Sequence, residues 1–195
     1  MNLSNIDEPN EQEQAPISTS GVSPSSGSFS DLRPNRQKLQ IRRVVSKHDR
    51  KRLRGLVRQV HEEGRFESSG WSEERYKKQF ERLVGNQDST LFLVAELGEC
   101  PIALMVCQIG DYLLGRDVRL ATVVAFNVAK QQRNGLLGGR AATRLLAETL
   151  HWARSKQAWE LAIHVTSGLE LARTDRFLKR AKFEVVGGNY VYRLQ

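Results

Sequence analysis

The sequence is poor in cysteine and contains no long hydrophobic run. Its two cysteines, Cys100 and Cys107, fall in one expected strand region, where the rise per residue separates them by about 23 Å, too far for a disulfide. Free thiols are typical of a reducing compartment. No apolar stretch approaches the ~20 residues that span a bilayer, and the chain does not open on a signal peptide. A cytoplasmic protein without membrane association is therefore expected.

Spacings typical of metal sites and of nucleophilic enzymes are also missing. The four histidines are scattered and the two cysteines are distant from them, so no metal-ligand set is expected. No serine-centred elbow or nucleophilic-cysteine signature is present. His48, His61 and His151 fall on expected helices, where we expect them to face solvent.

The net charge is +8, with 30 basic and 22 acidic side chains. A basic balance favours anionic partners, among them nucleic acid, acidic proteins, a membrane surface or a phosphate-rich cofactor, and does not choose between them. Nucleic-acid binding would rest on charge alone, because no recognised reader motif and no interleaved aromatic platform accompanies it.

Residues 1–36 differ from the rest of the chain. They are rich in Ser, Pro and Gly, and no basic residue precedes Arg33. Such a composition is typical of an arm that is disordered or is ordered by a protein partner, although a solubilising tail is the common alternative. We expect one domain over residues 37–195.

That domain alternates between strand and helix patterns. Expected strands cover residues 39–45, 91–97, 102–109, 118–128, 159–165 and 189–194. Four helices are expected: one begins after a cap at Ser46, one begins after a cap at Ser72, and two more cover residues 138–156 and 173–181. Gly98 and Glu99 would join two of the strands as a hairpin. The order predicts a mixed α/β sheet flanked by helices, with an antiparallel first half and a βαβ crossover in the second half.

Residues 125–146, AFNVAKQQRNGLLGGRAATRLL, carry the chemical signal. A strand ends, a loop with a basic residue and glycines follows, and a helix begins. Glycines let a backbone approach a ligand, and free N–H groups at a helix N-terminus favour an anion such as a pyrophosphate. The alternative is a plain strand-to-helix turn.

This segment, with RFLKRAKFEVV further on, resembles the GNAT acetyltransferase family and most closely its phage-encoded members. Val128 matches the end of the family's strand, Arg133 the basic position and Gly138 the last glycine of its loop. The resemblance implies acetyl-CoA bound by the backbone of Asn127 and Val128 and by the loop residues Arg133, Asn134, Gly135, Leu136, Leu137, Gly138 and Gly139. It also implies an amine acceptor where the fourth and fifth strands splay apart.

The sequence departs from the family pattern at several positions. Leu136 stands in place of the middle glycine, Leu178 in place of a tyrosine that protonates the leaving thiolate, and Lys182 in place of a glycine. The fourth strand carries no carboxylate that could serve as a base. His164 is the candidate to replace the missing base, and Tyr190 or Tyr192 the missing acid. The alternatives are a hydrogen-bonded core histidine and aromatic residues that only pack in the last strand.

Two functions follow from the resemblance. One is an acetyl-CoA-dependent N-acetyltransferase acting on a protein or small-molecule amine, which the retained loop residues favour. The other is a GNAT-fold protein without catalysis that has a structural or interaction role, for example as a component of a bacteriophage virion. The acidic arm beside a basic body favours this second function.

Overall fold

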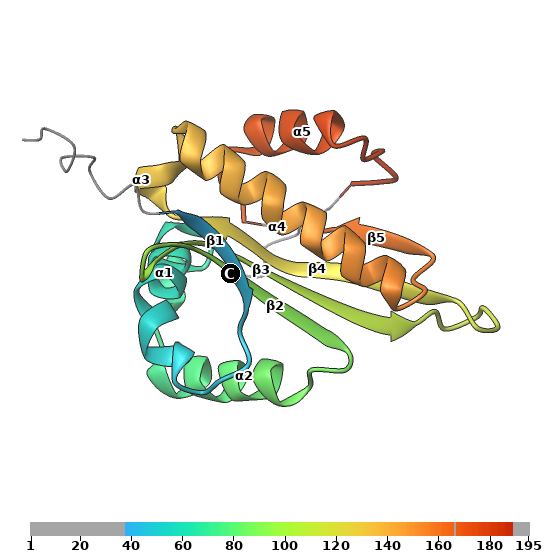
Figure 1. Cartoon of the computed structure of the whole chain (residues 1–195), viewed down its shortest axis with the longest axis horizontal. Helices are drawn as coiled ribbons and strands as arrows, with labels where there is room; N and C mark the ends of the chain where they lie inside the picture. The colour runs from blue at the N-terminus through green and yellow to red at the C-terminus, as the bar shows by residue number, and fades with distance from the viewer. Residues whose placement is uncertain (1–37, 166, 189–195) are drawn as a thin grey trace, which may run out of the picture. The chain divides into compact units, whose positions relative to one another are not determined.

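The computed structural model describes residues 38–165 and 167–188. Five strands form one sheet in the order β1-β2-β3-β4-β5 (Figure 1). The strands are β1 (Leu39–Arg43), β2 (Thr90–Leu97), β3 (Cys100–Asp111), β4 (Arg119–Val128) and β5 (Glu160–Ile163). The helices are α1 (Asp49–Glu63), the 3-10 turn η1 (Glu67–Ser69), α2 (Glu73–Gly85), α3 (Lys130–Arg133), α4 (Leu136–Ser155) and α5 (Leu171–Arg180).

The strand pairing confirms the expected mixed α/β sheet. The pairs β1–β2, β2–β3 and β3–β4 are antiparallel, whereas β4 and β5 are parallel and joined through α4 as a βαβ crossover. The expected final strand, 189–194, and the arm, 1–36, lie outside the described residues and stay predictions. No helix in the described ranges is long and apolar enough to cross a bilayer.

Helices cover both faces of the sheet, because its strands are apolar on both sides. Helix α4 lies on one face, and α1 and α2 lie on the other (Figure 1). Along β3, Met105 and Cys107 pack toward α4, while Leu104 and Val106 pack toward α1 and α2. This alternation is the period of two expected for a strand, and it divides the interior into two hydrophobic clusters.

Two local signals are confirmed and one is wrong. Leu97 pairs with Cys100, so Gly98 and Glu99 form the expected hairpin loop, and the Ser72 hydroxyl accepts a hydrogen bond from the Arg75 N–H at 3.3 Å as the cap of α2. The Ser46 cap is wrong. Helix α1 begins at Asp49 with His48 in the cap position and without a side-chain cap.

A charged cluster surrounds Asp49, the first residue of α1. The buried Asp49 carboxylate does not cap a helix turn but pairs with Arg42 of β1 at 2.7 Å, and Arg42 also binds the buried Glu96 of β2 at 2.8 Å. Hydrogen bonds to Glu96 and then Asp49 raise the pKa of the Arg42 guanidinium above its usual value. The cluster ties the start of α1 to the sheet, and α1 then runs toward β4.

Candidate active site

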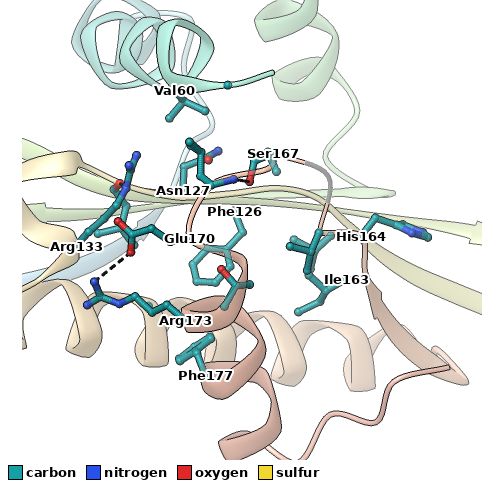
Figure 2. A pocket seen from close by; sticks show the side chains of 18 of the residues that line it. Val60, Phe126, Asn127, Arg133, Ile163, His164, Ser167, Glu170, Arg173 and Phe177 are labelled. Carbon is teal, nitrogen blue, oxygen red and sulfur yellow. Dashed lines mark hydrogen bonds and ion pairs between the residues drawn. The ribbon is translucent and has the colours of Figure 1, made fainter. Parts of the chain in front are cut away.

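A cavity of about 420 Å³ opens at the point where β4 and β5 separate. The end of α1, the second half of β4, the first turns of α4, the end of β5 and one side of α5 line it. Figure 2 shows Val60 of α1 on one side, Phe126 and Asn127 of β4 in the middle, and Arg173 and Phe177 of α5 on the other side. A volume of this size is typical of a small-molecule site.

The separation of the two strands coincides with a bulge in β4. Parallel pairing with β5 ends at Val123 and Ile163. On the other edge of β4 the register shifts at the same place: Ala125 pairs with Val106 and Val123 with Cys107, which leaves Val124 without a partner and 53% exposed. Because a bulge bends its strand and increases the local twist, β4 turns away from β5 here.

The bulge also decides which side chains of β4 face which helices. Before it, Val123 packs toward α4; after it, Phe126 and Val128 do so, while Ala125 packs toward α1 and α2. Without the extra residue, the alternation would exchange these two faces. The bulge therefore brings Phe126 under α5, where its ring lies 5.8 Å from that of Phe177.

Main-chain groups of β4 face the open side of the separation. The Ala129 N–H donates to the Ile102 carbonyl of β3 at 2.8 Å, so the alternation of an antiparallel ladder directs the peptide groups of Phe126 and Val128 away from β3. No described strand pairs with residues 124–128 on that side. The Val128 carbonyl accepts a hydrogen bond from Arg133 Nε at 2.8 Å.

Arg133 is held by the protein rather than directed at the first turn of α4. Its guanidinium forms an ion pair with Glu63, the last residue of α1, and both side chains are 15% exposed. Together with the bond to Val128, this pair joins α1 to the end of β4. The basic position of the loop thus has a structural contact that its spacing in the sequence did not predict.

The N-terminus of α4 is uncapped. Gly135 occupies the cap position and no side chain of the described residues accepts from the first turn, so the leading N–H groups of the helix are available to an anion. Gly138 and Gly139 line the cavity, whereas Asn134, Gly135, Leu136 and Leu137 adjoin it without lining it. Leu136 is 90% exposed and its φ is not positive, so leucine fits where the family pattern has glycine.

The two glycines of α4 differ in what surrounds them. A Cβ on Gly138 would lie 2.0 Å from the Gln132 carbonyl oxygen, while a Cβ on Gly139 would meet nothing within 4 Å. Gly138 is therefore required because α3 and α4 approach closely, and Gly139 leaves open space beside the cavity.

His164, the expected base, lines the cavity but is exposed. In Figure 2 its imidazole points away from Phe126 and Arg173. Tyr190, the expected acid, lies outside the described residues. Leu178 does not line the cavity; its neighbour Phe177 does.

His61 is the polar residue that the sequence interpretation placed wrongly in solvent. It lines the cavity from the last turn of α1, and its Nε2 is buried without a hydrogen-bond partner in the described structure. Its ring meets that of Trp71 edge-on at 5.8 Å. The signal was present: His61 lies four residues after Val57 and eight after Leu53, which puts it on the inward stripe of the helix.

Comparison with known proteins identifies the class of fold. No protein-family model and no curated protein matches the sequence. Among solved structures, the aminoglycoside N-acetyltransferase AAC(6')-Iy, in complex with a bisubstrate analog of CoA, matches with a TM-score of 0.61 and 19% identity over 81% of this chain and 99% of that one. Ribosomal-protein-alanine N-acetyltransferase from Brucella melitensis biovar Abortus 2308 matches with a TM-score of 0.60 and 13% identity over 81% and 100%.

A third match points the same way. Glucosamine-6-phosphate N-acetyltransferase from Arabidopsis thaliana has a TM-score of 0.59 and 12% identity over 81% of this chain and 99% of its own. At this level of identity the likeness shows the fold, and the chain has the GNAT acetyltransferase fold.

Proposed function

We propose that the protein is an acetyl-CoA-dependent N-acetyltransferase that transfers an acetyl group to an amine. One observation carries the proposal: a single cavity joins the unpaired edge of β4, at its separation from β5, to the uncapped first turn of α4. The structural matches support it, because one was solved with a bisubstrate analog of CoA and another with CoA.

The residues present suit the parts of such a donor. Free N–H groups in the first turn of α4 suit a pyrophosphate, and the space beside Gly139 leaves the backbone approachable. The peptide groups of Phe126 and the N–H of Val128, whose carbonyl is bound by Arg133, suit the amides of an extended pantetheine chain, which would add to the open edge of the sheet. When bound, acetyl-CoA supplies an acetyl group activated as a thioester.

The chain must then remove a proton from the amine. As the nitrogen attacks the carbonyl carbon, an N–C bond forms and the C–S bond breaks; nitrogen loses a proton and the leaving sulfur gains one. His61 lines the cavity and its buried Nε2 has no hydrogen-bond partner among the described residues, and we assign it the role of proton acceptor. A positioned base contributes about 10²- to 10⁴-fold to such a step.

Calorimetry with the full chain tests the donor site. Gly139→Ala adds only a methyl group in open space, whereas Gly139→Glu adds a negative charge there. We expect micromolar acetyl-CoA binding by the wild type, at most a few-fold weaker binding by Gly139→Ala, whose methyl group enters the space beside the backbone, and a loss of at least 10-fold with Gly139→Glu. A folded wild-type protein that does not bind millimolar acetyl-CoA would refute the enzyme and favour the non-catalytic GNAT-fold module, including a virion component.

Release of free thiol from acetyl-CoA tests the base. We expect His61→Gln to lower kcat by about 100-fold with acetyl-CoA affinity unchanged. His164→Gln is the comparison, because His164 is exposed and its ring points away from Phe126 and Arg173. If His164→Gln abolishes turnover and His61→Gln does not, the assignment is wrong.

A further inference from the structure

We infer that the acceptor is a small primary amine carried on an aromatic group, and that this group binds in a second cavity beside the first. The inference rests on the proposed acetyl transfer and specifies its acceptor. It comes from three features of the described structure: the lining of the second cavity, the residues that it shares with the first, and the charges around both.

The second cavity measures about 430 Å³ and lies between α1, α2 and the sheet. Aromatic side chains dominate one wall, with Trp71, Tyr76, Phe80 and Phe92 in successive ring contacts at 5.2, 5.9 and 5.6 Å. A dry apolar cavity of about 150 Å³ already accepts benzene. The space and its chemistry therefore suit one or two fused aromatic rings.

The two cavities meet at a wall that they share. Val60, His61, Ala125 and Asn127 line both. Of these, His61 and Asn127 are polar, and His61 Nε2 has no partner in the described structure. An aromatic group in the second cavity would therefore place a short aminoalkyl arm beside the residue that takes the proton, next to the separation of β4 and β5.

The charges around the cavities disfavour a polycationic acceptor. Among the residues that the structure describes, no carboxylate lines the second cavity, whereas Arg75 does. Of the described residues that line the first cavity, the carboxylate Glu170 is paired with Arg173 at 3.2 Å and Arg133 is paired with Glu63, while Arg65 adds positive charge. A molecule with several ammonium groups would contact arginines and would find no free carboxylate among the described lining residues, and charges of like sign repel at contact distance. An amine with a single nitrogen and an apolar body avoids that repulsion.

The test uses tryptamine and 2-phenylethylamine against methylamine, spermidine and kanamycin. Burial of one aromatic ring corresponds to about a 10- to 100-fold gain in affinity. We therefore expect a KM for the two aromatic amines at least 10-fold below that for methylamine, and no preference for the polycations. Calorimetry should also detect tryptamine binding to the chain without an acyl donor.

Variants of α2 locate the binding. Gln79 lines the second cavity from an exposed position, so Gln79→Trp fills its mouth without disturbing the core; Lys78→Trp is the matched control on the neighbouring exposed position, which does not line it. Gln79→Trp should weaken tryptamine binding at least 10-fold and leave acetyl-CoA binding unchanged, and Lys78→Trp should change neither. Arg75→Glu should improve the use of spermidine.

The outcomes separate the two proposals. Failure of acetyl-CoA binding refutes the transferase, whatever tryptamine does. Two results would overturn the aromatic acceptor and leave the transferase standing, provided that acetyl-CoA binds. One is acetylation of polycations, peptides or methylamine with the same efficiency as the aromatic amines. The other is tryptamine binding that is unchanged by Gln79→Trp.

Discussion

Two neighbouring glycines of α4 should respond in opposite directions to the same substitution. In Gly138→Ala the new methyl group would lie 2.0 Å from the Gln132 carbonyl oxygen and 2.7 Å from its carbon. Both atoms are backbone, so α3 has to move away from α4. Overpacking of this kind lowers the free energy of unfolding by about 3 kcal/mol, and the higher helix propensity of alanine offsets about 1 kcal/mol of that loss. We expect a net loss of about 2 kcal/mol in the free energy of unfolding.

Gly139→Ala makes no contact within 4 Å. It keeps the helix-propensity gain alone, so we expect stabilisation by about 0.5–1 kcal/mol. The two variants should thus differ by about 3 kcal/mol, although each adds one methyl group to the same helical turn.

Urea denaturation measures this difference. With an m-value of about 2 kcal/mol/M, the midpoints should differ by about 1.5 M, with the wild type between them. Because the movement of α3 displaces the first turn of α4, Gly138→Ala should also bind acetyl-CoA more weakly than Gly139→Ala. Equal midpoints for the two variants would contradict the close approach of α3 and α4 on which the donor site depends.

Three further predictions concern the rest of the domain. Lys182 has φ +64°, a left-handed conformation that suits glycine, so Lys182→Gly should stabilise the protein by about 0.5–1 kcal/mol in the same urea assay. Burial raises the pKa of the Cys107 thiol to about 12, so a thiol reagent at neutral pH should modify the exposed Cys100 alone until the protein unfolds. Because the unfolded thiol ionises near its usual value while the folded one keeps its proton, stability should fall from about pH 9 to 12, and Cys107→Ala should reduce that slope. Glu96 is buried between two arginines, so Glu96→Gln should lower the free energy of unfolding by about 3 kcal/mol. Glu62 forms an exposed pair, so Glu62→Gln should lower it by under about 0.5 kcal/mol. Similar losses in the two variants would show that burial of the ion pair does not determine its contribution to stability.

Hydrophobic periodicity predicted most of the fold because each helix and strand has a distinct buried face. The 3.6-residue stripe of α1, the cap at Ser72 and the hairpin at Gly98 are local signals, and the structure follows all three. The cap expected at Ser46 was wrong, and the Asp49 carboxylate at the start of α1 instead pairs with Arg42 of β1, seven residues earlier. Local capping rules do not include such a contact.

The site was less accessible to sequence reasoning because its main features are tertiary. The bulge at Val124 appears in no residue pattern, since any residue can occupy it, yet it opens the edge of β4. The partner of Arg133 is Glu63, which lies 70 positions earlier in the chain. His61, in contrast, could have been found by extending the inward stripe of α1 by one more turn.

Amide hydrogen exchange of the full chain with and without acetyl-CoA directly tests whether the donor binds between β4 and α4. We expect acetyl-CoA to slow exchange at Phe126 and Val128 of β4 and in the first turn of α4, with smaller changes in the other strands. Protection confined to other segments, or none at saturating acetyl-CoA, would contradict a donor site between β4 and α4.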